Sequence, residues 1–124
     1  MTAELTGEAD RIHKLSLTAL AREQLVVAGR STSSRSAATV FGGHERTMRQ
    51  TVIALLQDAR LDEHENPGEA TVLVLTGRVE LSADGDVWQA RTGDLLVVPP
   101  ARHSLRALED STVLLTAVPR GHGN

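Results

Sequence analysis

Short apolar runs of strand length, separated by turn residues, follow one another along the chain from about residue 36 onward. Most runs are rich in Val, Ile, Leu and Thr, and Gly, Pro, Asn, Asp or Ser bound them, which is the pattern of strands and their turns. Turn signals recur roughly every 8–12 residues, a spacing that favours an antiparallel sandwich or barrel. The predicted strands cover residues 38–41, 49–56, 70–75, 79–82, 86–90, 95–98, 103–107 and 111–118.

A tight hairpin is predicted at Asp84-Gly85, between the runs 79–82 and 86–90. Both central residues of the turn that best joins two twisted strands need positive φ, and an Asp-Gly pair adopts this conformation readily. The two runs should therefore pair directly with each other.

One helix is predicted before the strands, because apolar residues recur between residues 16 and 28 at three- and four-residue spacing. The stripe consists of Leu17, Leu20, Ala21 and Leu25. Ser16 is the expected N-cap, and Gly29 is the expected end of the helix. The stripe must be buried, either on the sheet of this domain or on a partner subunit.

The chain divides by composition into three predicted parts. Residues 1–35 form a polar segment, the amphipathic helix and a Ser-rich linker. Residues 36–118 form the β domain, and residues 119–124 form a flexible tail rich in Gly and His.

Composition narrows the classes of function. The 124 residues include no Cys, which excludes a disulfide framework, a thiolate zinc site and a Cys nucleophile. The net charge is −3 and Lys14 is the only lysine, so no basic patch for nucleic acid is expected. No apolar run approaches the roughly 18–20 residues of a membrane span. The acidic N-terminus lacks the pattern of a secretory signal, so we expect a soluble cytoplasmic protein.

Two segments carry a family resemblance. Residues 64–77 read HENPGEATVLVLTG, and residues 93–103 read GDLLVVPPARH. These segments resemble the two conserved motifs of the cupin family. The resemblance implies an all-β fold, a double-stranded β-helix (an RmlC-like jelly-roll barrel), here preceded by one short N-terminal α-helix.

The metal motif of cupins is degenerate in this chain. The first cupin motif supplies two histidines separated by one residue and then a glutamate. The resemblance places His64 on the first histidine, but Asn66 on the second and Ala70 on the glutamate. The second motif places His103 on its histidine, one residue closer than usual to Pro99. Residues two apart on a strand share a face, so His64 and Asn66 should face the barrel interior, where His103 would join them.

The predicted ligand pocket consists of His64, Asn66, Ala70, Val72 and His103. Aliphatic residues complete the predicted interior: Val74, Leu95 or Leu96, Val97 or Val98, and Leu105. Trp88 is expected to pack between the sheets. Two imidazoles can bind a divalent Zn, Ni, Mn or Fe ion, but most protein sites use three or four ligands. Asp62 or Glu69 is the candidate third ligand beside His64 and His103.

Two classes of function stay open on these residues. The first is a small protein that binds a small molecule in the barrel cavity without a full metal site. The second is a metal-dependent enzyme, an oxygenase or isomerase, that uses a reduced two-histidine site. In either class we expect a homodimer, because small cupins usually pair through their sheets.

Overall fold

The computed structural model describes residues 11–43, 45–64 and 68–119, and of residues 63 and 64 it describes the backbone alone. Within these residues it contains one helix, α2 (Leu17–Arg30), and nine strands. The strands are β1 (Arg35–Phe41), β2 (Arg49–Leu55), β3 (Arg60–His64), β4 (Gly68–Thr76), β5 (Arg78–Ala83), β6 (Asp86–Arg91), β7 (Leu95–Val98), β8 (His103–Ala107) and β9 (Ser111–Pro119). The predicted all-β fold with one preceding helix is confirmed. Most of the predicted tail, residues 120–124, lies outside the described residues.

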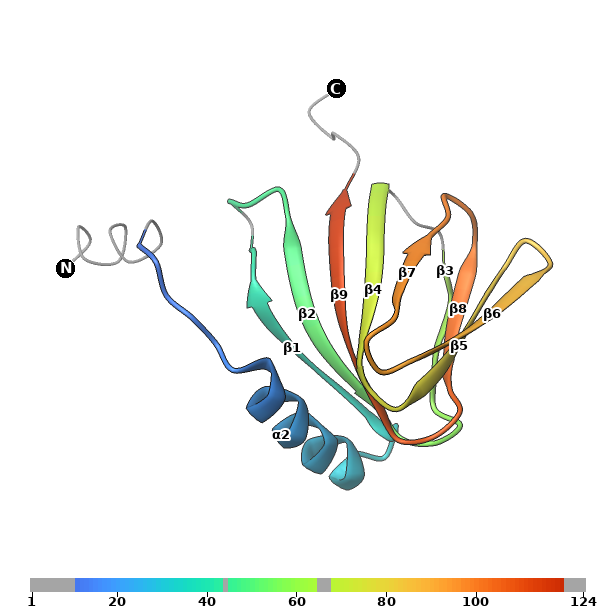
Figure 1. The fold of residues 1–124 in the computed structure, drawn as a ribbon, viewed down its shortest axis with the longest axis horizontal. Coiled ribbons are helices and arrows are strands. Elements are labelled where there is room, and N and C mark those ends of the chain that lie inside the picture. Colours follow the sequence, from blue (N-terminus) through green and yellow to red (C-terminus); the bar gives the residue numbers. More distant parts are fainter. Residues whose placement is uncertain (1–10, 44, 65–67, 120–124) are drawn as a thin grey trace.

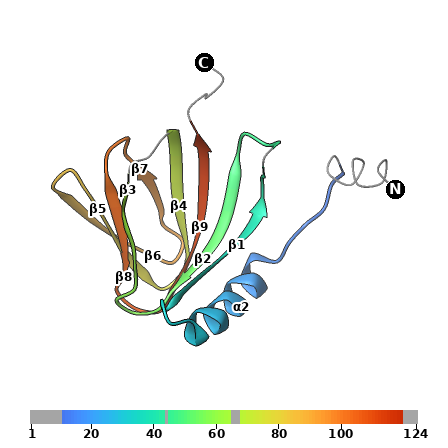
Figure 2. The same ribbon diagram turned by 180° about the vertical axis from the view of Figure 1, so that it is seen from behind.

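The strands form two antiparallel sheets that face each other. The five-stranded sheet has the order β1-β2-β9-β4-β7, and the four-stranded sheet has the order β3-β8-β5-β6. Strands that are far apart in the sequence lie side by side in both sheets, as in a jelly roll. Figures 1 and 2 show the strands converging toward the bottom of the view and fanning out toward the top. β7 and β6 are the edge strands on the open side of this sandwich.

The hydrophobic core fills the space between the sheets. Alternate residues of β8 are buried, namely His103, Leu105 and Ala107, because successive side chains on a strand point to opposite faces. Leu105 and Ala107 pair with Leu81 and Val79 of β5, which are also buried. The other buried members of the core are Ile53, Leu55, Val72, Val74, Ala90, Val98 and Val113. The predicted interior positions of Val72, Val74 and Leu105 are therefore confirmed. Of the two candidates Val97 and Val98, Val98 is the buried residue.

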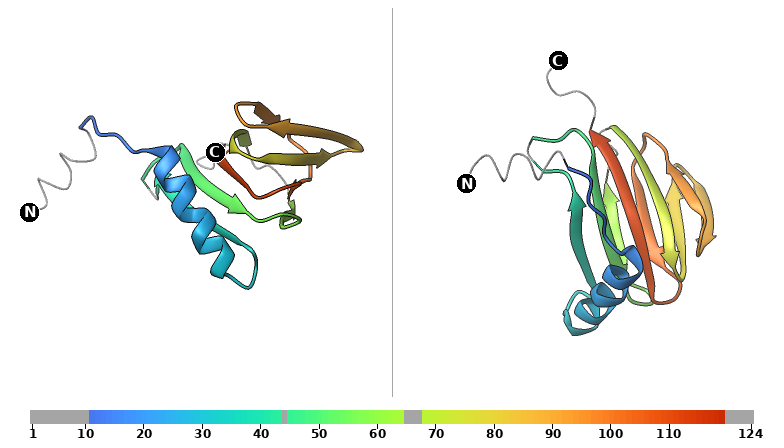
Figure 3. Two further views of the ribbon diagram at one scale, coloured as in Figure 1. Left: turned by 60° about the horizontal axis from the view of Figure 1, so that its bottom comes forward. Right: turned by 60° about the vertical axis from the view of Figure 1, so that its left-hand side comes forward.

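Helix α2 packs on the outer face of the five-stranded sheet, against β1 and β2 (Figure 3). Ser16 caps it as predicted, since its Oγ accepts a hydrogen bond from the Ala19 N–H at 3.1 Å. The buried helix residues are Ala21 and Ala28, whose small side chains let the helix approach the sheet closely. The Ser36 Oγ donates to the Gln24 carbonyl at 2.8 Å and ties the helix to β1. The apolar stripe lies on the sheet of this domain, where Ala21 is buried and Leu17, Leu20 and Leu25 are half-buried.

The predicted hairpin joins β5 to β6 directly. Its central residues Asp84 and Gly85 have φ of 55° and 85°, the conformation for which an Asp-Gly pair is suited. Strand β3, in contrast, was not among the predicted runs, because its sequence Arg-Leu-Asp-Glu-His contains only one apolar residue.

Candidate functional site

His103 is the best described of the residues predicted to form the site. It is the first residue of β8 and is buried. Its Nδ1 lies 2.9 Å from the carbonyl oxygen of Ala101. A carbonyl oxygen can only accept, so Nδ1 carries the hydrogen, and in the neutral ring the lone pair is on Nε2. Nε2 is thus the ring atom that can accept a hydrogen bond or bind a metal ion.

The backbone brings His64 and His103 together. β3 pairs with β8, and these two histidines are Cα partners in the register. The register shifts between Leu61 and His64, which marks a bulge or irregularity just before the pair. The His64 side chain and all of Asn66 lie outside the described residues.

The two predicted site residues on β4 contribute only hydrocarbon. Ala70 is half-buried and packs against the hydrophobic core, and Val72 is part of that core. Their cross-strand partners on β7 are Val98 and Leu96. Where the cupin motif has a glutamate, this chain therefore presents a methyl group beside aliphatic side chains.

A metal centre with three or more ligands does not fit the described residues. Asp62 and Glu69, the candidate third ligands, are both exposed. Over residues 11–43, 45–62 and 68–119, no three side chains of His, Cys, Asp or Glu group so that they could hold a metal ion. We therefore derive no chemistry through a metal from this site.

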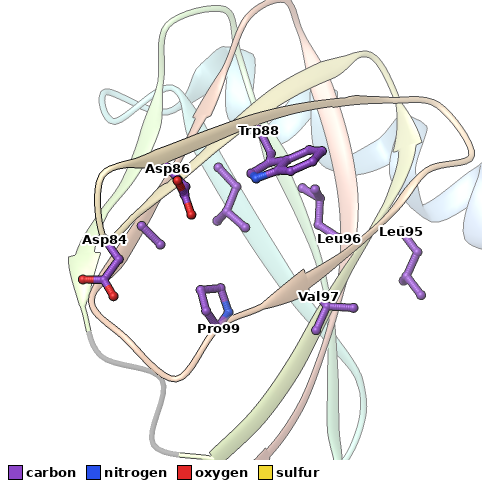
Figure 4. Close-up of a pocket in the computed structure, with 9 residues that line it drawn as sticks. Asp84, Asp86, Trp88, Leu95, Leu96, Val97 and Pro99 are labelled. Atoms are coloured by element: carbon purple, nitrogen blue, oxygen red, sulfur yellow. The ribbon is translucent and has the colours of Figure 1, made fainter.

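A pocket of about 420 Å³ lies on the open side of the sandwich, where edge strands β6 and β7 face each other (Figure 4). Side chains from the β5–β6 hairpin form one wall, and residues of β7 and the turn after it form the other. The lining residues are Leu81, Ala83, Asp84, Asp86, Trp88, Leu95, Leu96, Val97 and Pro99. None of them is among the five residues predicted to form the ligand pocket, but Leu95, Leu96 and Val97 were among the aliphatic candidates for the interior.

Trp88 is 67% exposed and lines this pocket, so the expectation that it packs between the sheets is wrong. It pairs with Leu81 across β5 and β6, and Leu81 is buried in the core. Trp88 thus belongs to the inner face of its sheet, but it lies on the edge strand, where the opposite sheet does not cover it. The sequence contains one signal for the exposure of Trp88. Asp86 lies two residues earlier, and residues two apart on a strand share a face, so a charged residue stands on the same face as the indole.

The two carboxylates of the pocket are unpaired. Asp84 and Asp86 are exposed, and within the described part of the chain neither makes a hydrogen bond or an ion pair. The indole N–H of Trp88 likewise has no hydrogen-bond partner among the described residues. The pocket therefore combines an apolar wall with three polar groups that are available to a ligand.

The pocket adjoins the histidine strand through Ala83. Ala83 lines the pocket, and it is the Cα partner of His103 across β5 and β8. A second hollow of about 500 Å³ lies beside the C-terminal end of β7 and shares Val97 with the first. It is lined by Ala70, one of the predicted pocket residues, and by Glu69, one of the candidate metal ligands.

Two facing antiparallel sheets with crossed strand order define a small jelly-roll domain. A family model described as the cupin domain matches residues 52–119. The chain belongs to the cupin family. No curated protein matches this sequence. Within the described residues, no helix has the length and apolar character needed to cross a membrane.

Solved structures agree with this assignment. A conserved protein of unknown function from Streptococcus pyogenes is 25% identical, with a TM-score of 0.66, over 73% of this chain and 79% of that protein. An RmlC-like cupin protein from Desulfovibrio desulfuricans is 28% identical, with a TM-score of 0.61, over 68% of this chain and 82% of that protein. KdgF from Halomonas sp. is 23% identical, with a TM-score of 0.61, over 72% of this chain and 82% of that protein. At this level of identity, the likeness to KdgF concerns the fold alone.

Proposed function

We propose that this cupin-domain protein binds a small molecule in the pocket between β6 and β7. The observation that carries the proposal is Trp88, which is 67% exposed on the wall of a hollow of about 420 Å³. Small-molecule sites in proteins typically measure about 300–1,000 Å³, and they combine apolar walls with a few polar groups. The pocket has this size and this composition.

The cost of exposing an indole supports the proposal. An aromatic side chain can bury about 150–250 Å² of surface, and its exposure forgoes that stabilisation. The indole has an apolar body and one N–H donor, so it can cover the flat face of a ligand and also donate a hydrogen bond. Leu81, the cross-strand partner of Trp88, and Leu96 extend the apolar surface of the pocket.

The pocket requires no metal ion for binding. Its polar groups are two carboxylates and an indole N–H, and the rest of its lining is apolar side chains. Binding therefore rests on burial of the apolar part of the ligand, with the polar groups fixing its orientation.

A metal-dependent oxygenase or isomerase is the second candidate, and one observation favours it. His64 and His103 are Cα partners, and the hydrogen bond to Ala101 leaves the lone pair of His103 on Nε2. Such a hydrogen bond is typical of metal-bound histidines, because it fixes the ring in the tautomer that can bind. Ala70 at the glutamate position argues against this candidate, because a methyl group supplies no donor atom.

Trp88 is the only tryptophan and the chain has no tyrosine, so intrinsic fluorescence excited selectively for indole reports on the pocket alone. We would titrate the protein with a library of small molecules and follow the emission of Trp88. We expect saturable changes in emission for compounds with an apolar body, together with a rise in melting temperature. A library without one saturable response would contradict the proposal.

A pair of variants on β6 serves as the matched test. Trp88→Leu removes the indole from the pocket, and Val87→Thr alters its exposed neighbour on the opposite face of the same strand. We expect the ligand-induced rise in melting temperature to be lost in the first variant and kept in the second. Equal losses in both would show that the strand is perturbed in general, and the pocket would not be the binding site.

A further inference from the structure

We infer that the ligand of this pocket is an organic cation, an ammonium group attached to a compact apolar body. This inference rests on the proposed function, and it adds the chemical class of the ligand. It follows from the way in which charge and apolar surface are divided within the pocket.

The acidic end of the pocket is formed by the β5–β6 hairpin. Asp84 lies in the turn, and Asp86 begins β6 on the same face as Trp88, two residues on. Figure 4 shows both carboxylates on one side of the hollow, with Pro99 and Leu96 facing them across it. A ligand that spans the pocket would thus meet negative charge at one end and hydrocarbon at the other.

No positive charge compensates the two carboxylates within the pocket. The described residues that line it include no Lys, Arg or His. A cation at the mouth would be attracted by both carboxylates, whereas an anion would be repelled by both. The pocket therefore selects by charge sign as well as by shape.

Trp88 strengthens the preference for a cation. The face of an indole carries negative charge density, and it attracts an ammonium group within roughly 6 Å of the ring. Asp86 and Trp88 are two residues apart on the same face of β6, so the carboxylate and the indole border the same part of the pocket. This pairing of an aromatic face with a carboxylate suits a quaternary or primary ammonium better than any neutral group.

A metal cation is a poorer occupant than an organic one. Calcium takes about six to eight oxygen ligands, and the described lining offers only two side-chain carboxylates. The remaining side chains of the lining are apolar. A metal ion would leave this apolar surface exposed to water, whereas the carbon body of an amine would cover it.

Three probes of nearly equal size and different charge separate these factors. They are cyclohexylmethylammonium, cyclohexylmethanol and cyclohexanecarboxylate, which do not absorb where indole is excited. Binding is followed by the single indole N–H peak of Trp88 in a nitrogen-correlated NMR spectrum and by its fluorescence. We expect the ammonium probe to bind about tenfold more tightly than the alcohol at low salt, and the carboxylate to bind most weakly. The preference should shrink as salt rises, because both carboxylates are exposed.

Charge-neutralising variants assign the effect to the pocket. Asp84→Asn keeps a residue that tolerates the positive φ of 55° at this turn, and Asp86→Asn keeps the size of the side chain. In the double variant, we expect the preference for the ammonium probe over the alcohol to fall to the smaller part that the indole face of Trp88 supplies. Glu23→Gln, which removes an exposed carboxylate from α2, should leave the preference unchanged.

The outcomes distinguish the inference from the proposed function. Alcohol or carboxylate probes that bind as tightly as the ammonium probe would overturn the inference while the pocket remained a binding site. A preference that is undiminished in the double variant would overturn it as well. If no probe shifts the Trp88 peak, the proposed function itself fails, and the inference fails with it.

Discussion

Ala83 of β5 and His103 of β8 are direct partners in the four-stranded sheet. One of the residues that line the pocket between β6 and β7 therefore lies beside the buried histidine. The histidine stands at a position that supplies a metal ligand in other cupins. In this chain its Nδ1 donates to Ala101, and the neighbouring strand opens onto an apolar pocket. The histidine strand therefore lies directly beside a strand that lines the pocket.

This relationship predicts the effect of removing the imidazole. His103→Ala loses a buried hydrogen bond and leaves a cavity, so we expect the free energy of unfolding to fall by about 1–3 kcal/mol. The Trp88 indole peak should also move, because the Ala83 backbone pairs with residue 103. Urea denaturation and the NMR spectrum measure the two effects. Gln89→Ala, at an exposed position of β6, is the control and should change stability by less than about 0.5 kcal/mol. An unchanged free energy of unfolding in His103→Ala would contradict the prediction.

The composition of the interior predicts the metal content. The resemblance places Ala70 where cupins have a glutamate ligand, and the alternative ligands Asp62 and Glu69 are exposed. We therefore expect the purified, untagged protein to contain well under one transition metal ion per chain. Elemental analysis before and after incubation with Zn, Ni, Mn and Fe(II) salts checks this. One equivalent of a metal that is lost in both His64→Ala and His103→Ala would contradict the prediction and favour the enzyme alternative. Glu23→Gln, which alters an exposed carboxylate on α2, is the control for nonspecific binding.

Gly77 and Gly85 have similar backbone conformations, but we expect their substitution by Ala to lower the free energy of unfolding by different amounts. Gly77 has φ of 91°, and a Cβ there would meet the Ser111 Cα at 2.8 Å. Gly85 has φ of 85°, and a Cβ there would meet nothing within 4 Å. We expect Gly85→Ala to cost about 1 kcal/mol from conformation alone, and Gly77→Ala to cost at least about twice that. Thermal and urea unfolding measure both, and equal costs would show that the contact with Ser111 is relieved by a backbone shift.

The features that could be predicted from the sequence are those encoded locally. The strand over residues 103–107 and the Asp84-Gly85 turn each depend on neighbouring residues, and both appear in the structure as predicted. The position of Trp88 could not be predicted in this way. Its hydrophobicity indicates burial, but its exposure depends on β6 being an edge strand that faces β7 across an open side. That arrangement is set by pairings between distant segments, and no local pattern records it.

A similar limit applies to β7, whose four residues are all apolar. A continuous apolar run does not indicate which face is buried. The structure resolves the alternatives, because Val98 is buried and Leu96 packs against the core, whereas Leu95 and Val97 are 59% and 72% exposed. The exposed pair lies on the outer face of the five-stranded sheet, and it leads to the last prediction.

An apolar row crosses the outer face of the five-stranded sheet. Its members are successive cross-strand partners: Val52 with Leu114, Leu114 with Leu73, and Leu73 with Leu95. At one end Val52 is completely buried on the face that α2 covers, and at the other end Leu95 is exposed. The helix thus covers only part of a continuous apolar surface. We propose that a second copy of the chain covers the rest, because a two-fold axis would place the same row against itself.

We therefore expect a homodimer in solution, held by the exposed end of this row. Leu95→Lys combined with Val97→Lys places two charges on the proposed contact without altering the core, so the variant should be a folded monomer. Both residues also line the pocket between β6 and β7, so this variant tests the dimer and not the binding of a ligand. Val87→Lys, at a residue that is 58% exposed on the outer face of the other sheet, should remain a dimer. Size-exclusion chromatography with light scattering gives the mass, and circular dichroism checks the fold. A monomeric native chain, or a double variant that remains a dimer, would contradict this arrangement. In the second case, the row would be ordinary surface and the subunits would meet elsewhere.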